Sequence, residues 1–277
     1  MGDALTWQAH KTGIGVWEPQ WLGDQTRYLY ASLHRSAVPG ARLAVLLVPP
    51  LFHEQPRSRR LLTEVASGLA AIGLPSMRFD FFGTADSAGN SDQTDFTSMC
   101  TDLEVAANAL RTKTGVDRVA VLAWRGAALP VARWLNEGGT PAVVILWEPI
   151  VDGAEWLNEL KREDAAERCS PDRYRMGPIV PALADERQLM GLAVSQRLCS
   201  DIAAAHLTSD EQSNAVRYWA VLRPATPTLA LSLEQIFDLP PDSPTFGGST
   251  RMDSGLFVTP PLKRVADELG RALLEVR

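Results

Sequence analysis

The stretch Arg78-Phe-Asp-Phe-Phe-Gly-Thr-Ala-Asp-Ser-Ala-Gly89 joins the end of a short strand, predicted over residues 76–79, to a loop rich in Gly, Ser and Asp. On both sides of it, continuous apolar runs typical of buried strands alternate with apolar residues at helical spacing. The predicted strands are 43–48, 76–79, 118–123, 142–147 and 228–233, and the predicted helices are 58–72, 101–113, 127–136 and 260–277. This alternation predicts an α/β fold, with a mostly parallel twisted sheet flanked by helices on both faces.

Two segments depart from this rhythm. Aromatic and β-branched residues around a turn at Gly23-Asp24 predict a hairpin over residues 17–34. After residue 147 the strands stop, and residues 152–222 hold two helical patterns, 154–168 and 184–206. We therefore expect a single domain over residues 1–277, with a helical lid insertion at 152–222.

The composition excludes several classes of protein. The chain has 277 residues and a formal charge of −6, which gives no general attraction to nucleic acid. Its three cysteines lack metal-ligand spacing, and no pattern indicates a metal site or a cofactor. The longest apolar stretch is far shorter than the roughly 20 residues that span a bilayer, and no signal peptide is present. We expect a cytoplasmic protein without membrane insertion, whose partner is a small-molecule ligand or another protein.

Three stretches carry a resemblance to a known family. The stretch 78–89 resembles the strand-and-loop signature of the serine-aminopeptidase branch of the α/β-hydrolases, usually Asp-x-x-Gly-x-Gly-x-Ser. Val48-Pro-Pro-Leu-Phe-His-Glu54 with Arg57-Ser-Arg-Arg60, and Leu146-Trp-Glu-Pro-Ile-Val-Asp-Gly153, resemble the exosortase A system-associated hydrolases within it. The resemblance runs from about Tyr28 to the C-terminus and implies an α/β-hydrolase fold.

The catalytic triad of that fold is missing from the sequence. A serine nucleophile normally sits on a strained strand-to-helix turn, Gly-x-Ser-x-Gly. The corresponding stretch is Val121-Leu-Ala-Trp-Arg-Gly-Ala127, which places Trp124 at the nucleophile position in one register and Arg125 in the other. Neither residue can form a covalent acyl intermediate. The triad histidine should follow the last strand, yet the four histidines are His10, His34, His53 and His206. We therefore predict that the chain is not a conventional serine hydrolase.

The loop after strand 43–48 supplies one candidate catalytic pair. Loops at this place normally donate oxyanion-hole amides, and this one contains His53 and Glu54. A His–Glu pair at the carboxyl end of a strand can carry out acid–base catalysis. In the alternative interpretation His53 caps the loop, and Glu54 pairs with Arg59 or Arg60.

The turn after strand 118–123 supplies the other candidates. Arg125 can bind a carboxylate or phosphate near a helix N-terminus, or it can pair with an acid such as Glu148. Trp124 can form the wall of a pocket or fill the old nucleophile site as part of the core. The candidate catalytic residues are thus His53, Glu54 and Arg125, and the candidate substrate-binding residues are Phe52, His53, Trp124, Arg125 and Glu148.

Three functions remain open. The first is a divergent protein that binds, or transforms by a non-classical route, a small acyl, ester or thioester-like ligand, anionic ones included. The second is a non-catalytic pseudo-hydrolase that serves as a ligand-binding or protein-interaction accessory factor. The third, which the resemblance implies, is a hydrolase of an exosortase or polysaccharide pathway. A deep pocket that contains Arg125 would favour the first function, and a cavity closed by Trp124 would favour the second.

Overall fold

The computed structural model describes residues 10–12, 15–36, 38–169, 187–208, 216–224, 226, 229–246 and 255–276. Nine of their strands form one sheet in the order β1-β2-β3-β5-β4-β6-β7-β10-β11. The antiparallel edge consists of β1 (His10–Thr12), β2 (Gly15–Gly23) and β3 (Tyr28–His34). The parallel strands are β4 (Ala44–Val48), β5 (Ser76–Phe79), β6 (Val119–Trp124), β7 (Val143–Trp147), β10 (Tyr218–Leu222) and β11 (Leu233–Asp238).

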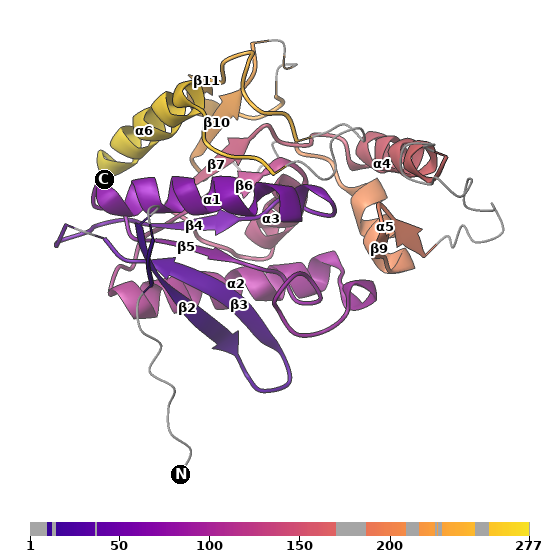
Figure 1. Cartoon of the computed structure of the whole chain (residues 1–277), viewed down its shortest axis with the longest axis horizontal. Helices are drawn as coiled ribbons and strands as arrows, with labels where there is room; N and C mark the ends of the chain where they lie inside the picture. Colours follow the sequence, from indigo (N-terminus) through magenta and orange to yellow (C-terminus); the bar gives the residue numbers. More distant parts are fainter. Residues whose placement is uncertain are drawn as a thin grey trace.

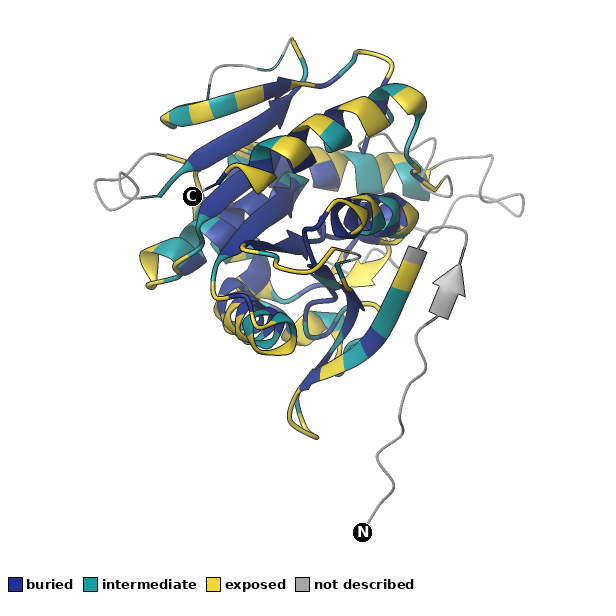
Figure 2. Cartoon of the chain, turned by 90° about the vertical axis from the view of Figure 1, so that its left-hand side faces the viewer, coloured by how far each residue is buried: buried dark blue, intermediate teal, exposed yellow. Residues whose placement is uncertain are grey.

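Helices cover both faces of the sheet (Figure 1). One face packs against α1 (Glu54–Ala71) and α6 (Pro260–Leu274), and the other against α2 (Phe96–Thr114) and α3 (Ala128–Asn136). Alternate residues of a strand point to opposite faces, so Val45 and Leu47 join the α1–α6 side while Leu46 joins the α2–α3 side. Both faces of the sheet are therefore covered by packed apolar side chains, as the continuous apolar runs predicted. The strands inside the sheet are buried (Figure 2).

Local capping sets the limits of the helices. Helix α2 begins five residues earlier than the predicted start at 101, because the Asp95 side chain accepts a hydrogen bond from Ser98 N and caps the first turn. It ends where Gly115 takes the left-handed conformation, with φ +69°. Helix α1 begins at Glu54 rather than at the predicted 58, so both members of the candidate His53–Glu54 pair lie at its N-terminus.

The connection between β7 and β10 carries α4 (Gly153–Arg168), a small hairpin of β8 (Gln188–Leu189) and β9 (Leu192–Ala193), and α5 (Gln196–Ala204). Figure 1 shows α4, α5 and β9 together beyond the ends of the central strands. The first residues of the predicted helix 184–206 lie outside the described residues, and its remainder begins as the β8–β9 hairpin.

Two predictions about the end of the sheet are wrong. Residues 218–222 were included in the helical insertion, but they form β10, a buried strand between β7 and β11. The segment between β7 and β10 therefore ends before Tyr218. The next strand was predicted at 228–233, but it runs from Leu233 to Asp238, and residue 228 lies outside the described residues. Among the described residues, no helix is both long and apolar enough to cross a membrane.

The strand order places the candidate site. The chain passes from β4 to β5 on one side and then returns to β6 on the other side of β4. Loops that follow adjacent strands diverge at such a reversal, which opens a crevice at their carboxyl ends. The loop after β4 and the turn after β6 therefore lie on either side of this crevice, and they carry His53, Glu54 and Arg125.

Candidate functional site

Three residues at the carboxyl ends of adjacent strands have a strained backbone. Phe52, in the loop after β4, has φ +54°, Arg125, directly after β6, has φ +54°, and Glu148, directly after β7, has φ +43°. Residues other than glycine rarely adopt this left-handed conformation, which costs about 1–3 kcal/mol and is concentrated at functional sites. The strain identifies the end of the sheet at which function is expected.

The turn after β6 has Arg125, and not Trp124, at its strained position. Trp124 is the last residue of β6 and is fully buried. Its indole stacks on that of Trp147 with ring centroids 4.2 Å apart, and the centroid of the Phe246 ring lies 5.8 Å from that of Trp124. The side chain is thus a member of the core between the sheet and α6, below the turn. Arg125, the first residue after β6, takes the strained position of this turn.

Arg125 is bound to an acid at the start of α1. Its Nε donates to Glu54 Oε1 at 3.2 Å, and its Nη1 donates to the main-chain oxygen of Glu148 at 3.3 Å. The Glu54 side chain is only 2% exposed, so this carboxylate has been removed from water. Burial raises the pKa of Glu54, and the Arg125 guanidinium opposes that rise. The alternative pairing of Glu54 with Arg59 or Arg60 is wrong, because those side chains bind Asp86 and Glu64.

The Glu148 carboxylate belongs to a second pair. Arg223, directly after β10, donates from Nε to Glu148 Oε1 at 2.5 Å. The same guanidinium donates to the main-chain oxygens of Pro241, Ser243 and Pro244. Arg223 thereby connects the loop after β11 to the end of β7. These charge-assisted hydrogen bonds hold the half-buried arginine in place.

A tryptophan from α4 covers the turn. A methyl group built on Gly126 would overlap the six-membered ring of Trp156, so the ring lies directly on the backbone after Arg125. The same indole packs against Phe52 with ring centroids 5.6 Å apart, and Trp156 is 3% exposed. In this fold the amide after the nucleophile and an amide of the loop after β4 form the oxyanion hole. Trp156 therefore packs beside Gly126 and against the ring of Phe52, which lie at these two places.

His53 lies beside this covered turn. It is 5% exposed, and neither ring nitrogen has a hydrogen-bond partner in the part of the chain that the structure describes. Burial, with the positive charges of Arg57 and Arg125, lowers the pKa of His53 to about 4. The imidazole is thus neutral near pH 7, with one donor and one acceptor nitrogen.

Buried polar atoms without partners gather at this end of the sheet. Within the described residues they include both nitrogens of His53 and one atom each of Glu54, Trp124, Glu148 and Ser243. A buried donor or acceptor left unsatisfied costs about 1–3 kcal/mol, and most such groups in native proteins are paired. Their concentration here marks a region whose polar groups are not matched by the fold alone.

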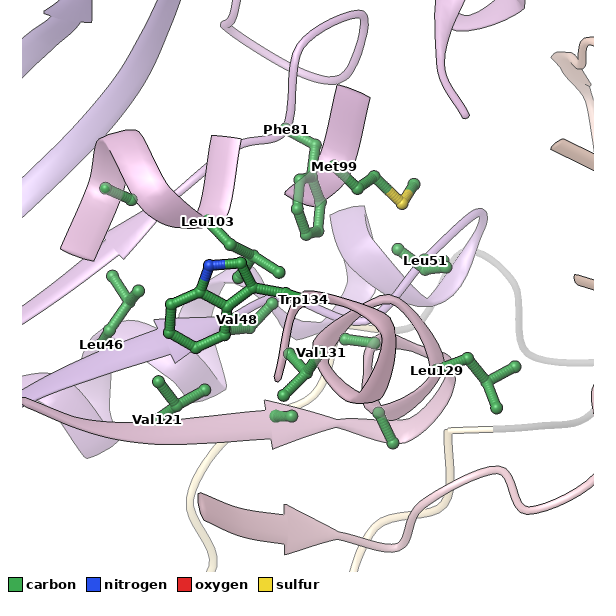
Figure 3. Close-up of a cluster of buried hydrophobic side chains, with 14 of the residues drawn as sticks. Leu46, Val48, Leu51, Phe81, Met99, Leu103, Val121, Leu129, Val131 and Trp134 are labelled. Atoms are coloured by element: carbon green, nitrogen blue, oxygen red, sulfur yellow. The ribbon is translucent and has the colours of Figure 1, made fainter. Parts of the chain in front are cut away.

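A cavity of about 520 Å³ lies next to Phe52 and His53. Its walls come from the loop after β4 and the start of α1 (51–59), the loop after β5 and the start of α2 (81–99), and the segment around β9 (190–198). Leu51, Phe81 and Met99 line it and also belong to the core cluster drawn in Figure 3. Phe52 and His53 line the cavity, whereas Glu54, Trp124, Arg125 and Glu148 are not among its lining residues.

Sequence reasoning missed Trp156 and Arg223. Trp156 is one of several apolar residues on a helical pattern, and nothing in that pattern indicates which surface it covers. Arg223 follows a strand that was not recognised, which removed the positional signal at strand ends. Among the described residues, no group of three or more His, Cys, Asp or Glu side chains is placed to hold a metal ion.

No family model matches the sequence, and none of the curated proteins matches it. Among solved structures, the chain is similar to the hypothetical protein PA2218 from Pseudomonas aeruginosa, at 13% identity and a TM-score of 0.61 over 98% of both chains. It is also similar to Est1E from Butyrivibrio proteoclasticus with bound ferulic acid, at 13% identity and a TM-score of 0.58 over 93% of this chain and 98% of that one. The α/β-hydrolase GrgF from Penicillium sp. sh18 is similar at 13% identity and a TM-score of 0.55, over 80% and 88%. The chain has the α/β-hydrolase fold.

Proposed function

We propose that this chain binds a small, largely apolar molecule in the cavity beside the turn and does not hydrolyse it by the serine-hydrolase route. The observation that carries the proposal is the Arg125–Glu54 pair on the strained turn. A guanidinium bound to a carboxylate is no nucleophile, and it occupies the position from which acyl transfer starts in this fold.

The covered backbone supports the same conclusion. Acyl transfer needs amide donors that are free to bind the developing oxyanion. Trp156 packs beside Gly126 and against the ring of Phe52, so its indole takes up space next to both backbone segments. The retained fold thus serves binding, and the Ser-His-Asp chemistry is missing from both the turn and the C-terminal loop.

The cavity has the properties of a ligand site. Its volume lies within the roughly 300–1,000 Å³ typical of small-molecule pockets. Its wall is mainly apolar, with polar side chains from the start of α1 and from the loop after β5. In this proposal the segment around β9 acts as the lid, because Met190, Leu192 and Val194 form part of the wall. The complex of Est1E with ferulic acid supports the use of this fold for a ligand of that size.

The setting of this function is part of the proposal. The likeness of residues 48–54, 57–60 and 146–153 to exosortase A system-associated hydrolases supports an accessory role in polysaccharide export. Three free cysteines support a reducing cytoplasm as the location.

A second candidate is non-classical acid–base chemistry on the bound molecule. It is supported by His53, a neutral and unpaired imidazole in the cavity wall of the described structure. Any such turnover would disappear on His53→Gln, whereas binding alone leaves the bound compound chemically unchanged.

The proposal is tested by a substitution that fills the cavity. Ala193 lines the cavity on β9, and Ala203 is an exposed residue of α5 that is not among the lining residues. The apolar dye N-phenyl-1-naphthylamine should bind the protein saturably, at about one equivalent. We expect Ala193→Trp to weaken dye binding at least tenfold and Ala203→Trp to leave it unchanged. Absence of saturable binding, or equal binding by both variants, would overturn the proposal.

A further inference from the structure

We infer that His53 recognises the polar end of the bound molecule, and that this molecule is uncharged and carries a hydrogen-bonding group such as an ester, ketone, amide or alcohol. The inference rests on the proposed ligand-binding function and goes beyond it by giving the chemical class of the ligand.

The position of His53 supports its role. Phe52 turns the chain with φ +54°, and His53 follows as the residue before α1, in the wall of the cavity. The side chain is buried, and neither nitrogen finds a partner in the described structure. A histidine kept for packing alone would be replaced without loss by an apolar residue of similar size. A ligand that accepts from one ring nitrogen, or donates to the other, would satisfy it.

The charges around the cavity disfavour an anion. Among the described lining residues the one arginine or lysine is Arg59, which is bound to Asp86 and lies 3.6 Å from Asp80. Arg125, close by, is bound to Glu54. His53 is neutral, because burial and the charges of Arg57 and Arg125 lower its pKa to about 4. A carboxylate placed here would lose its hydration without gaining a free cation.

A cationic ligand meets a similar difficulty. Arg57 and Arg125 lie close enough to His53 to affect its protonation, and both would repel an ammonium group there. The nearest lining carboxamide, Gln55, already donates to Asp80 and Thr84. An uncharged polar group therefore fits the surroundings of His53 better than either kind of ion.

The rest of the cavity wall is apolar, so the remainder of the ligand should be apolar as well. Leu51, Phe52, Phe81, Met99 and Leu198 are buried apolar residues of this wall. On the loop after β5, the hydroxyl groups of Thr84 and Thr94 already donate to the main-chain oxygens of Phe81 and Phe82. These hydroxyls are held within the protein, which leaves His53 as the buried polar side chain of the wall with unmet capacity among the described residues.

The experiment compares four probes that share one phenylpropyl body: methyl 3-phenylpropanoate, 3-phenylpropanamide, 3-phenylpropanoate and 3-phenylpropylamine. Each is titrated against the bound dye at pH 7.5. The ester and the amide should displace the dye at concentrations at least tenfold below those needed for the carboxylate and the amine. In His53→Leu the four values should fall within about threefold of one another.

Two further variants make this result specific. His53→Gln keeps a donor and an acceptor and should retain the preference for the ester and the amide. His206→Leu changes a half-exposed histidine outside the cavity wall and should behave like the unaltered protein. If His53→Leu does not fold, the ring nitrogen chemical shifts of His53 in the unaltered protein should move with the ester and not with the carboxylate.

The outcomes separate this inference from the proposed function. Stronger displacement by the carboxylate, or a preference that survives in His53→Leu, overturns the role of His53 while ligand binding stands. Unmoved His53 shifts on saturation with the ester overturn it as well. Failure of the dye itself to bind, or equal binding by Ala193→Trp, overturns the proposed function and the inference together.

Discussion

Arg125 and Glu54 are 71 residues apart in the chain, yet the guanidinium of one donates to the carboxylate of the other at 3.2 Å across the carboxyl ends of β6 and β4. Glu54 is removed from water, and Arg125 is 20% exposed. The pair therefore binds the strained turn to the start of α1, and each of the two charges is met by the other.

Breaking this pair should be costly. In Arg125→Met the Glu54 carboxylate remains buried without its partner, and we expect the free energy of unfolding to fall by about 3 kcal/mol. Arg125→Met combined with Glu54→Met should recover most of the loss, because two apolar side chains of similar length replace the ion pair. Urea unfolding measures both. Lys263→Met, which breaks an exposed pair with Asp267, should change stability by less than about 1 kcal/mol. Additive losses in the double variant would show that the two side chains do not interact.

The protein should show no serine-hydrolase turnover. A fluorophosphonate probe should label no residue, and short nitrophenyl esters should hydrolyse no faster than with a control protein of matched surface charge. Loss of the nucleophile or the base leaves only about 10³–10⁴-fold acceleration over water, below the reach of an ordinary assay. Arg125→Ser should remain inactive, because Trp156 covers the turn and no histidine follows Leu207. Stoichiometric labelling of one serine, abolished by its mutation, would contradict this.

Trp156 and Gly126 should be energetically coupled. In Gly126→Ala the new methyl group overlaps the Trp156 ring, and we expect a loss of about 1–3 kcal/mol from overpacking. A smaller ring at position 156 should relieve the overlap, so Gly126→Ala should cost less when combined with Trp156→Phe. Gly68→Ala is the control, since its methyl group enters open space on α1 and should stabilise the protein by about 0.5–1 kcal/mol. An equal cost of Gly126→Ala with and without Trp156 would refute the contact.

Asp102 should make stability depend on pH in an unusual direction. Burial raises the pKa of Asp102 from 3.8 to about 6, although it accepts from Arg27 and from Phe82 N. Because the folded chain holds this proton more tightly than the unfolded chain, the contribution of Asp102 is greatest below about pH 4 and is lost as pH rises through about 6. The stability of Asp102→Asn relative to the unaltered protein should therefore increase between pH 4.5 and 7.5.

Urea unfolding at four pH values across that range checks the Asp102 prediction. Asp92→Asn, at an exposed position in the loop before α2, is the control. A constant difference between Asp102→Asn and the unaltered protein over the whole range would show that the Asp102 carboxyl does not titrate there.

The sequence by itself determined the layered fold. Strands β4, β5, β6 and β7 begin and end within one residue of their predicted limits, because a strand buried on both faces must be apolar throughout. The prediction failed at β10 and β11. β10 has a continuous apolar run, Tyr218–Leu222, as the inner strands do, but it was included in the helical insertion that precedes it. β11 is an edge strand that exposes Ile236 and Glu234 on one face, so it lacks the continuous apolar pattern of an inner strand.

The sequence also predicts that the nucleophile and the histidine of the triad are absent, since both are defined by residue type at a position along the chain. Only the tertiary structure decided which residue takes the strained turn, that Glu54 binds Arg125, and that Trp156 covers Gly126. Hydrophobic periodicity reports how deeply a residue is buried within its own element. It carries no information about which side chain of a distant element completes the contact, because strand order and helix placement decide that only when the chain is packed.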